Sequence, residues 1–208
     1  MAGKYKPILF STDMVRAILR KESPKTVTRR AIKPQPGHNV AALVRESDEW
    51  IPWTVTGGCL PGRVIPPWRV GDRLWVREAF APFVGAMGRG AIYKADDTHR
   101  VPLDLCLGEK WKPSIHMPRA YSRITLEVVS VTAERLLDIT EEDAMAEGVE
   151  PVCMDEMARI PVDIMAKLDS LEEPSYALGF FSLWVRIYGY ESLIENPLVW
   201  RNEFNILK

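Results

Sequence analysis

Cysteine is scarce in this chain of 208 residues, and the few cysteines present are isolated. Cys59, Cys106 and Cys153 are odd in number, lie far apart and form no close pair with another Cys or a His. This pattern excludes a disulfide framework and a zinc-ribbon spacing, and it is typical of a reducing cytoplasm. Because the sequence also shows no metal-ligand cluster and no glycine-rich phosphate loop, we expect neither a metal nor a cofactor.

A charge excess and a long apolar run are also absent. Lys and Arg number 27 against 28 for Asp and Glu, which leaves a net charge of −1. The chain as a whole is therefore not a polycation that coats nucleic acid, and any basic surface must be local. No stretch of about 18 apolar residues occurs, and the first residues lack the unbroken apolar segment of a signal peptide. We expect a cytoplasmic protein with no membrane partner.

Proline and tryptophan, by contrast, are plentiful, with 16 and seven residues. Prolines at that density break a chain into short strands and turns, so we expect an α+β, mainly β fold built as a small barrel with peripheral helices. Helical spacing and caps predict three helices, at about 12–23, 140–147 and 176–187. Alternating apolar residues and β-branched residues predict strands at about 26–32, 73–79, 91–94, 122–136 and 198–206.

Two segments have the composition of insertions into a single domain of residues 1–208. Residues of about 35–68 hold many Pro and Gly and indicate loops and short hairpins, and those of about 150–175 are weakly helical. Because an insertion packs on the outside, we expect Trp50 and Trp53 to be more exposed than Trp75 and Trp200, which lie in predicted strands.

A first candidate site is the run Lys25-Thr26-Val27-Thr28-Arg29-Arg30. A lysine, two hydroxyls and two arginines can hold a phosphate or carbonyl oxygen, or a desolvated lysine can activate a hydroxyl nucleophile. The alternative is a solvated edge strand. Residues three apart on one ideal strand point to opposite faces, so Lys25 and Thr28 converge only if Lys25 still lies on the turn after Pro24.

A second candidate is Glu147, at the end of the predicted helix that begins with Thr140. Glu141, Glu142 and Asp143 lie in the first turn, where the helix dipole favours acids. Glu147 lies at the opposite end, where the dipole disfavours an acid. Its position therefore predicts a cation partner.

A third candidate is the segment from Trp111 to Arg119, with a proline on each side of Ser114-Ile115-His116-Met117. A rigid loop that presents an aromatic ring and cations suits a stacked base beside a phosphate. A structural loop with Trp111 in the core is the alternative. His116 by itself is no metal site, because no second ligand stands at the required spacing.

Four segments, taken in order, resemble the ASCH domain family, and most of all its longer members from phages and prophages. They are the helix followed by Lys25 to Arg30, the strand Gly71 to Glu78, the strand Arg123 to Val131 with Leu137 to Thr140, and the closing Pro197 to Trp200. The resemblance spans both ends of the chain and leaves the two insertions outside it. It implies a PUA-like β-barrel with a cleft that binds RNA or a nucleoside.

Short bacterial members of that family hydrolyse the acetyl amide of acetylcytidine with a Lys-x-x-Thr pair and a later Glu. The resemblance therefore implies that Lys25, Thr28 and Glu147 are catalytic, and that the partner is a modified nucleoside or single-stranded RNA. The residues that we expect to bind the substrate are Arg30, Trp75, Arg77, Glu78, Trp111 and His116.

Three other functions fit the same residues. A non-catalytic reader of RNA or modified DNA would use the cations for phosphates and Trp75 or Trp111 for a base. A ribonuclease would use the same lysine and acid. A phage protein that acts on a host protein would use the proline-rich insertion as its contact surface.

Overall fold

The structure of the chain is a computed structural model that describes residues 3–37, 40–47, 49–85, 88–96, 110–153 and 174–207. These residues form two compact units. Unit 1 comprises Met1–Lys25, Val70–Val129 and Phe204–Lys208, and unit 2 comprises Thr26–Arg69 and Ser130–Glu203. Most of the second expected insertion, and Cys106, lie outside the described residues.

Strands dominate the mixed α+β fold, as the sequence predicts, and they form one larger sheet and two hairpins. The larger sheet has the order β1-β5-β8-β9-β2. This order is open, with β1 and β2 as end strands, so the described strands do not close into the expected barrel. The strands are β1 (Tyr5–Leu9), β2 (Val27–Ala31), β3 (Val40–Glu46), β4 (Glu49–Thr54), β5 (Arg73–Arg77), β6 (Phe80–Gly85), β7 (Gly88–Tyr93), β8 (Thr125–Arg135) and β9 (Leu198–Ile206).

Unit 1 is built on β5, which pairs with β1 in parallel and with β8 in antiparallel orientation. Its buried face carries residues that alternate along the strands, among them Ile8, Leu74 and Leu126. Helix α1 (Thr12–Leu19) begins as the sequence predicts, because the Ser11 side chain accepts a hydrogen bond from the Met14 N–H.

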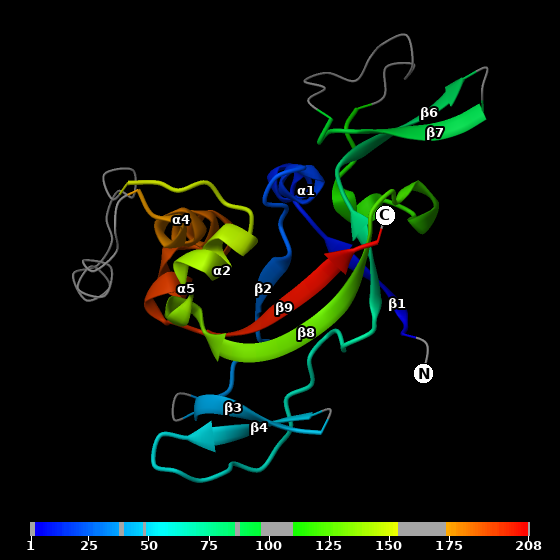
Figure 1. The fold of residues 1–208 in the computed structure, drawn as a ribbon. Helices are drawn as coiled ribbons and strands as arrows, with labels where there is room; N and C mark the ends of the chain where they lie inside the picture. The colour runs from blue at the N-terminus through cyan, green and yellow to red at the C-terminus, as the bar shows by residue number, and fades with distance from the viewer. Residues whose placement is uncertain are drawn as a thin grey trace. The chain divides into compact units, whose positions relative to one another are not determined.

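Unit 2 pairs β2 with β9 in antiparallel orientation and packs helices against them (Figure 1). Helix α2 (Glu141–Ala146) starts at the N-cap Thr140 and is followed by Gly148 at a φ of 75°, both as expected. Helices α4 (Tyr176–Tyr188) and α5 (Tyr190–Ile194) complete the group. Their apolar side chains form one buried cluster with β9: Leu136, Ile139, Ala144, Leu178, Phe181, Trp184, Leu193 and Val199.

The first insertion contains the hairpin of β3 and β4, and one of its tryptophans is not where we expected it. Trp50 is only 7% exposed, and its ring lies edge-on to that of Trp200, with the centroids 5.5 Å apart. The expectation of an exposed Trp50 is therefore wrong: alternate residues of β4 turn inward, so a hairpin added to the outside still buries one face. Trp53 on the other face is 41% exposed and Trp200 is buried, as expected, whereas Trp75 is only half-buried.

None of the helices in the described part of the chain combines the length and the apolar character needed to span a membrane.

Candidate functional site

Lys25 is the last residue of unit 1 and precedes the strand in which Thr28 lies. Its side chain is wholly buried, and its ammonium lies 5.9 Å from the centroid of the Phe10 ring. The Lys25 N–H donates to the Ala17 carbonyl at 3.0 Å, at the end of α1. Strand β2 begins only at Val27, so Lys25 lies before the strand, in the segment after Pro24. The alternation of an ideal strand therefore does not force Lys25 and Thr28 onto opposite faces.

The start of β2 lies beside the end of α2 in unit 2. The Thr26 N–H donates to the Ala146 carbonyl at 2.9 Å. The Arg29 guanidinium lies 3.4 Å from the Glu147 carboxylate, so the cation partner predicted for Glu147 is present. The segments of Thr28 and Glu147 are therefore neighbours although they are more than 100 positions apart in the sequence.

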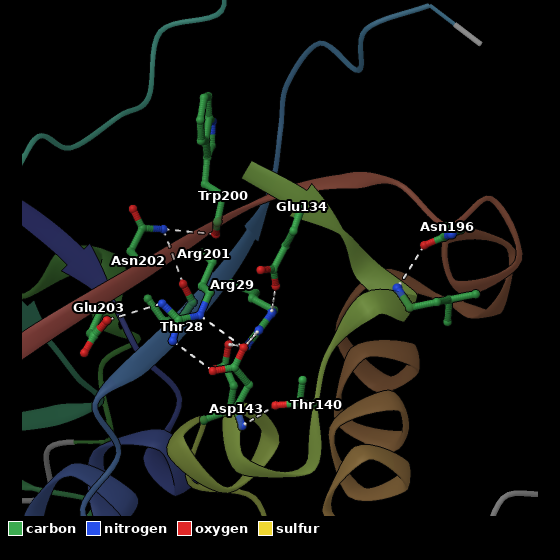
Figure 2. Close-up of polar contacts among 12 residues, drawn as sticks. Thr28, Arg29, Glu134, Thr140, Asp143, Asn196, Trp200, Arg201, Asn202 and Glu203 are labelled. Atoms are coloured by element: carbon green, nitrogen blue, oxygen red, sulfur yellow. Dashed lines mark hydrogen bonds and ion pairs between the residues drawn. The ribbon is translucent and has the colours of Figure 1, made fainter. Parts of the chain in front are cut away.

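Arg29 is the centre of a buried ion-pair network. Its side chain is fully buried and donates to Glu134 and to Asp143, each at 2.6 Å, while its guanidinium lies 5.7 Å from the Phe180 ring centroid. Arg201, directly opposite Arg29 in the β2–β9 ladder, donates to both carboxylate oxygens of Asp143. Figure 2 shows the two guanidiniums converging on Asp143, which ties the ladder to α2.

The network moves the pKa values of two of its acids in opposite directions. Burial raises the pKa of Glu134 above its usual value, although Arg29 opposes the rise. Burial would also raise the pKa of Asp143, but its ion pairs with Arg201 and Arg29 outweigh that cost and lower it. The network therefore binds Asp143 in its charged form.

The other face of the same ladder holds two buried oxygen atoms without a hydrogen-bond partner in the described structure. They are Thr28 Oγ1 and Asn202 Oδ1, on residues directly opposite each other in β2 and β9. The Asn202 Nδ2 donates to the Thr28 and Trp200 carbonyls at 3.3 and 3.1 Å, which orients the amide and leaves Oδ1 as the available acceptor. Buried polar atoms are almost always hydrogen-bonded, so this pair is prepared for a water or a ligand.

Trp200 and Arg30 form the next opposed pair on that face, and Figure 2 shows Trp200 on the side of β9 away from Asp143. Trp200 also lines a pocket of about 340 Å³ in unit 2. Prolines and aliphatic residues of the first insertion make up most of the wall, and Lys33 and Arg63 add positive charge. The pocket has the size of a small-molecule site, and its lining is about equally polar and apolar.

The remaining expected site residues lie in unit 1 and form two groups. Trp75 and Arg77 share one face, with the guanidinium 5.4 Å from the indole centroid, and Arg77 donates to the Ile115 carbonyl. The exposed His116 follows Ile115, so the structure brings Trp75, Arg77 and the His116 loop together.

Glu78 and Trp111 are placed differently. Glu78 is 1% exposed, and the Arg123 guanidinium donates to both of its carboxylate oxygens, at 2.9 and 3.0 Å. Burial raises the pKa of Glu78 in spite of that pairing. Trp111 is half-buried, and its buried Nε1 has no hydrogen-bond partner in the described structure. In the part of the chain that the structure describes, neither side chain forms a hydrogen bond or an ion pair with Arg77.

Two residues of the site were not anticipated. Arg29 lies inside the motif, and strand alternation together with the acid-rich helix 141–147 would have identified it as the partner of Glu147. Asn202 is one of two amides in β9, with Asn205, and residue type alone does not single it out. Within the described residues, no group of three His, Cys, Asp or Glu side chains is arranged to hold a metal ion.

Comparison with known proteins found no matching family model, no matching curated protein and no matching solved structure.

Proposed function

We propose that this chain is an ASCH-type protein with PUA-like ancestry that binds a modified nucleoside and hydrolyses the amide of an N4-acylated cytidine. The observation that carries the proposal is the pair of buried, unpartnered oxygens of Thr28 and Asn202. A buried hydroxyl and a buried amide oxygen without hydrogen-bond partners lower the stability of the fold unless a ligand or a water supplies the missing hydrogen bonds.

An amide group has the right polar atoms to complete this pair. Directly opposed residues in an antiparallel ladder have Cβ atoms about 5 Å apart, so one small group can contact both side chains. The substrate N–H donates to Asn202 Oδ1, and the adjacent carbonyl carbon lies beside the Thr28 hydroxyl. Arg30 and Trp200 form the next opposed pair, and we assign the rest of the nucleoside to them.

The proposed reaction adds one water across the amide. The Thr28 oxygen attacks the carbonyl carbon, or orients the water that does, and Lys25 takes the proton as a neutral amine. The C–N bond then breaks, and the proton that Lys25 took passes to the leaving exocyclic nitrogen, directly or through Glu147. The products are cytidine and a carboxylic acid, and water completes the turnover if an acyl-Thr28 ester has formed.

The ion-pair network supports this assignment of Glu147 by fixing its position. Arg29 joins Glu147 and Asp143 to β2, so the acid and the hydroxyl are carried by two elements that are held together. Pre-organisation of that kind is what an acid or base needs in order to act on a bound substrate.

The experiment is a chromatographic assay of the purified chain with a panel of N4-acylated cytidines. The wild type and Thr28→Ser, which keeps the hydroxyl, are expected to release cytidine. Thr28→Val, which keeps the shape but removes the hydroxyl, is expected to lose at least about 100-fold in rate, the usual contribution of such a group. Thr54→Val, on the hairpin, is the matched control.

No release of cytidine from any member of the panel by the folded wild type contradicts the proposal. Turnover that Thr28→Val leaves unchanged removes Thr28 from the mechanism and leaves a lysine-activated water. Thermal unfolding of each variant establishes that a loss of rate is not a loss of fold.

A further inference from the structure

The pocket of about 340 Å³ in unit 2 is lined by two short segments and by parts of three strands. One segment, residues 32–37, follows β2, and the other, residues 60–65, lies in the first insertion after β4. Val40 and Pro52 from the hairpin and Trp200 from β9 complete the lining. Apart from Trp200, none of these residues has a part in the proposed hydrolysis, so that reaction does not account for the pocket.

Hydrogen bonds hold both segments in place. The Gln35 Nε2 donates to the carbonyls of Ile32 and Leu198 at 2.8 and 2.9 Å, and its Oε1 accepts from the Leu198 N–H at 3.0 Å. In the second segment, the Val64 N–H donates to the Trp50 carbonyl at 2.8 Å. The walls are therefore formed before a ligand arrives, which lowers the cost of binding one.

The apolar part of the lining consists largely of rings. Trp200 is held by Trp50, whose ring lies edge-on to it with the centroids 5.5 Å apart. Prolines have rigid rings and no backbone N–H, so they add flat apolar surface without a donor. The four prolines of the lining are Pro34, Pro36, Pro52 and Pro61. A flat aromatic ring is the ligand group that suits such walls.

The charged part of the lining is positive. Lys33 and Arg63 are its only charged residues. Arg63 is paired with Glu49, which lies outside the lining. Lys33 is exposed and has no carboxylate within ion-pair distance in the described part of the chain. The pocket therefore has one cation to offer to a ligand, and a single negative charge matches it.

We propose that this pocket binds a small aromatic carboxylate. The carboxylate accepts hydrogen bonds from the Lys33 ammonium, and the ring lies against Trp200 and the prolines. A phosphate monoester carries about two negative charges at neutral pH, so one cation would leave much of its charge uncompensated. The inference goes beyond the proposed hydrolysis, because it requires neither a base nor a sugar.

The test is isothermal titration calorimetry of the full chain with 2-naphthoate and with its neutral isostere 2-naphthamide. Naphthoate is expected to bind, and naphthamide to bind about 2- to 5-fold more weakly, the usual effect of one charge pair near a surface. Lys33→Gln is expected to weaken naphthoate by the same factor and to leave naphthamide unchanged, whereas Lys33→Arg keeps the preference. Leu60→Trp is expected to weaken both ligands at least about 10-fold, because the larger ring fills the pocket.

The matched control is Lys94→Gln, at an exposed lysine of unit 1, which should change the binding of neither ligand. Thermal unfolding checks that Leu60→Trp folds, and Lys33→Gln, at an exposed position, keeps the test decisive if it does not. Absence of naphthoate binding at millimolar concentration overturns the proposal. Equal affinity for the two ligands overturns it, as does a loss in Lys94→Gln as large as that in Lys33→Gln. Because the probes are not nucleosides and the measurement is of binding, the result is independent of the hydrolysis assay.

Discussion

Arg29 and Asp143 lie 2.6 Å apart, guanidinium nitrogen to carboxylate oxygen, and join β2 to the first turn of α2 across 114 positions. The arginine is fully buried, whereas the aspartate remains 23% exposed. Such a pair holds two distant segments in register, and it leaves a buried charge behind if one partner is removed.

We therefore expect Arg29→Met to lower the free energy of unfolding by about 3–5 kcal/mol, because the buried Glu147 loses its cation. Urea unfolding measures the change. Arg45→Met, at an exposed arginine of β3, is the control and should stay within about 0.5 kcal/mol. If the two variants are equally stable, the network does not hold unit 2 together.

Asp143 predicts a pH dependence of stability. Although burial acts in the other direction, its ion pairs lower its pKa below the usual 3.8, so the folded state binds a proton less readily than the unfolded chain. The stability that this contributes is complete above about pH 3.8 and is lost as the pH falls through the lower folded-state value. Asp143→Asn should destabilise the protein at neutral pH and approach the wild type in acid.

Chemical unfolding of Asp143→Asn and wild type, at neutral pH and below about pH 3.8, measures the difference in stability. Glu46→Gln, on the exposed side of β3, should show no such dependence. A loss for Asp143→Asn that is the same at neutral and acid pH would mean that the residue acts through packing and not through its charge.

The proposed catalytic residues should behave as one unit. If the proposed hydrolysis takes place, Lys25→Ala, Thr28→Ala and Glu147→Gln each lower kcat by orders of magnitude, and double variants are far from additive. Arg30→Ala, in a binding role, mainly raises KM. Steady-state kinetics on an acylated cytidine separates these cases, and additive losses among the three would argue against a shared mechanism.

The tryptophans of β4 should differ sharply in their contribution to stability. Trp50 is 7% exposed and its ring packs against that of Trp200. Trp50→Ala is therefore expected to lower the free energy of unfolding by about 3–5 kcal/mol, because of the cavity that it leaves. Trp53→Ala, on the 41% exposed face of the same strand, is the matched control and should cost far less. Equal losses in urea unfolding would place the Trp50 ring outside the core.

Much of the local structure follows from short stretches of sequence. Caps were expected at the starts of the three predicted helices, with Ser11 or Asp13 as candidates for the first. Ser11, Thr140 and Ser175 each accept the backbone hydrogen bond of an N-cap. The strand predicted at 198–206 is β9 with the same bounds. Capping and alternation depend on neighbours within a few residues, so a pattern of residue types suffices to find them.

The candidate site was predictable only in part. The order of motifs marked Thr28 and Glu147, and the helix dipole predicted a cation beside Glu147. Strand alternation and the acid-rich helix were the signals that the sequence offered for Arg29 as that cation. Nothing in the sequence singled out Asn202, because its position opposite Thr28 depends on the register between β2 and β9. Trp50 was misplaced for the same reason, since composition says that a segment is inserted but not which of its faces packs.

The sequence by itself determined where three helices begin, which strands alternate, and that no charge excess covers the whole chain. It placed the end of the first helix at about 23, whereas α1 ends at Leu19. Strand alternation already puts Arg29 and Thr28 on opposite faces, but only the tertiary structure decided that one faces Asp143 and the other lies beside Asn202. The tertiary structure also decided that Arg73 stacks on the Tyr5 ring of β1 and that Arg77 stacks on the Trp75 ring of β5. The physical reason is that a strand places successive side chains on opposite faces, while the partner that each face meets comes from a distant part of the chain.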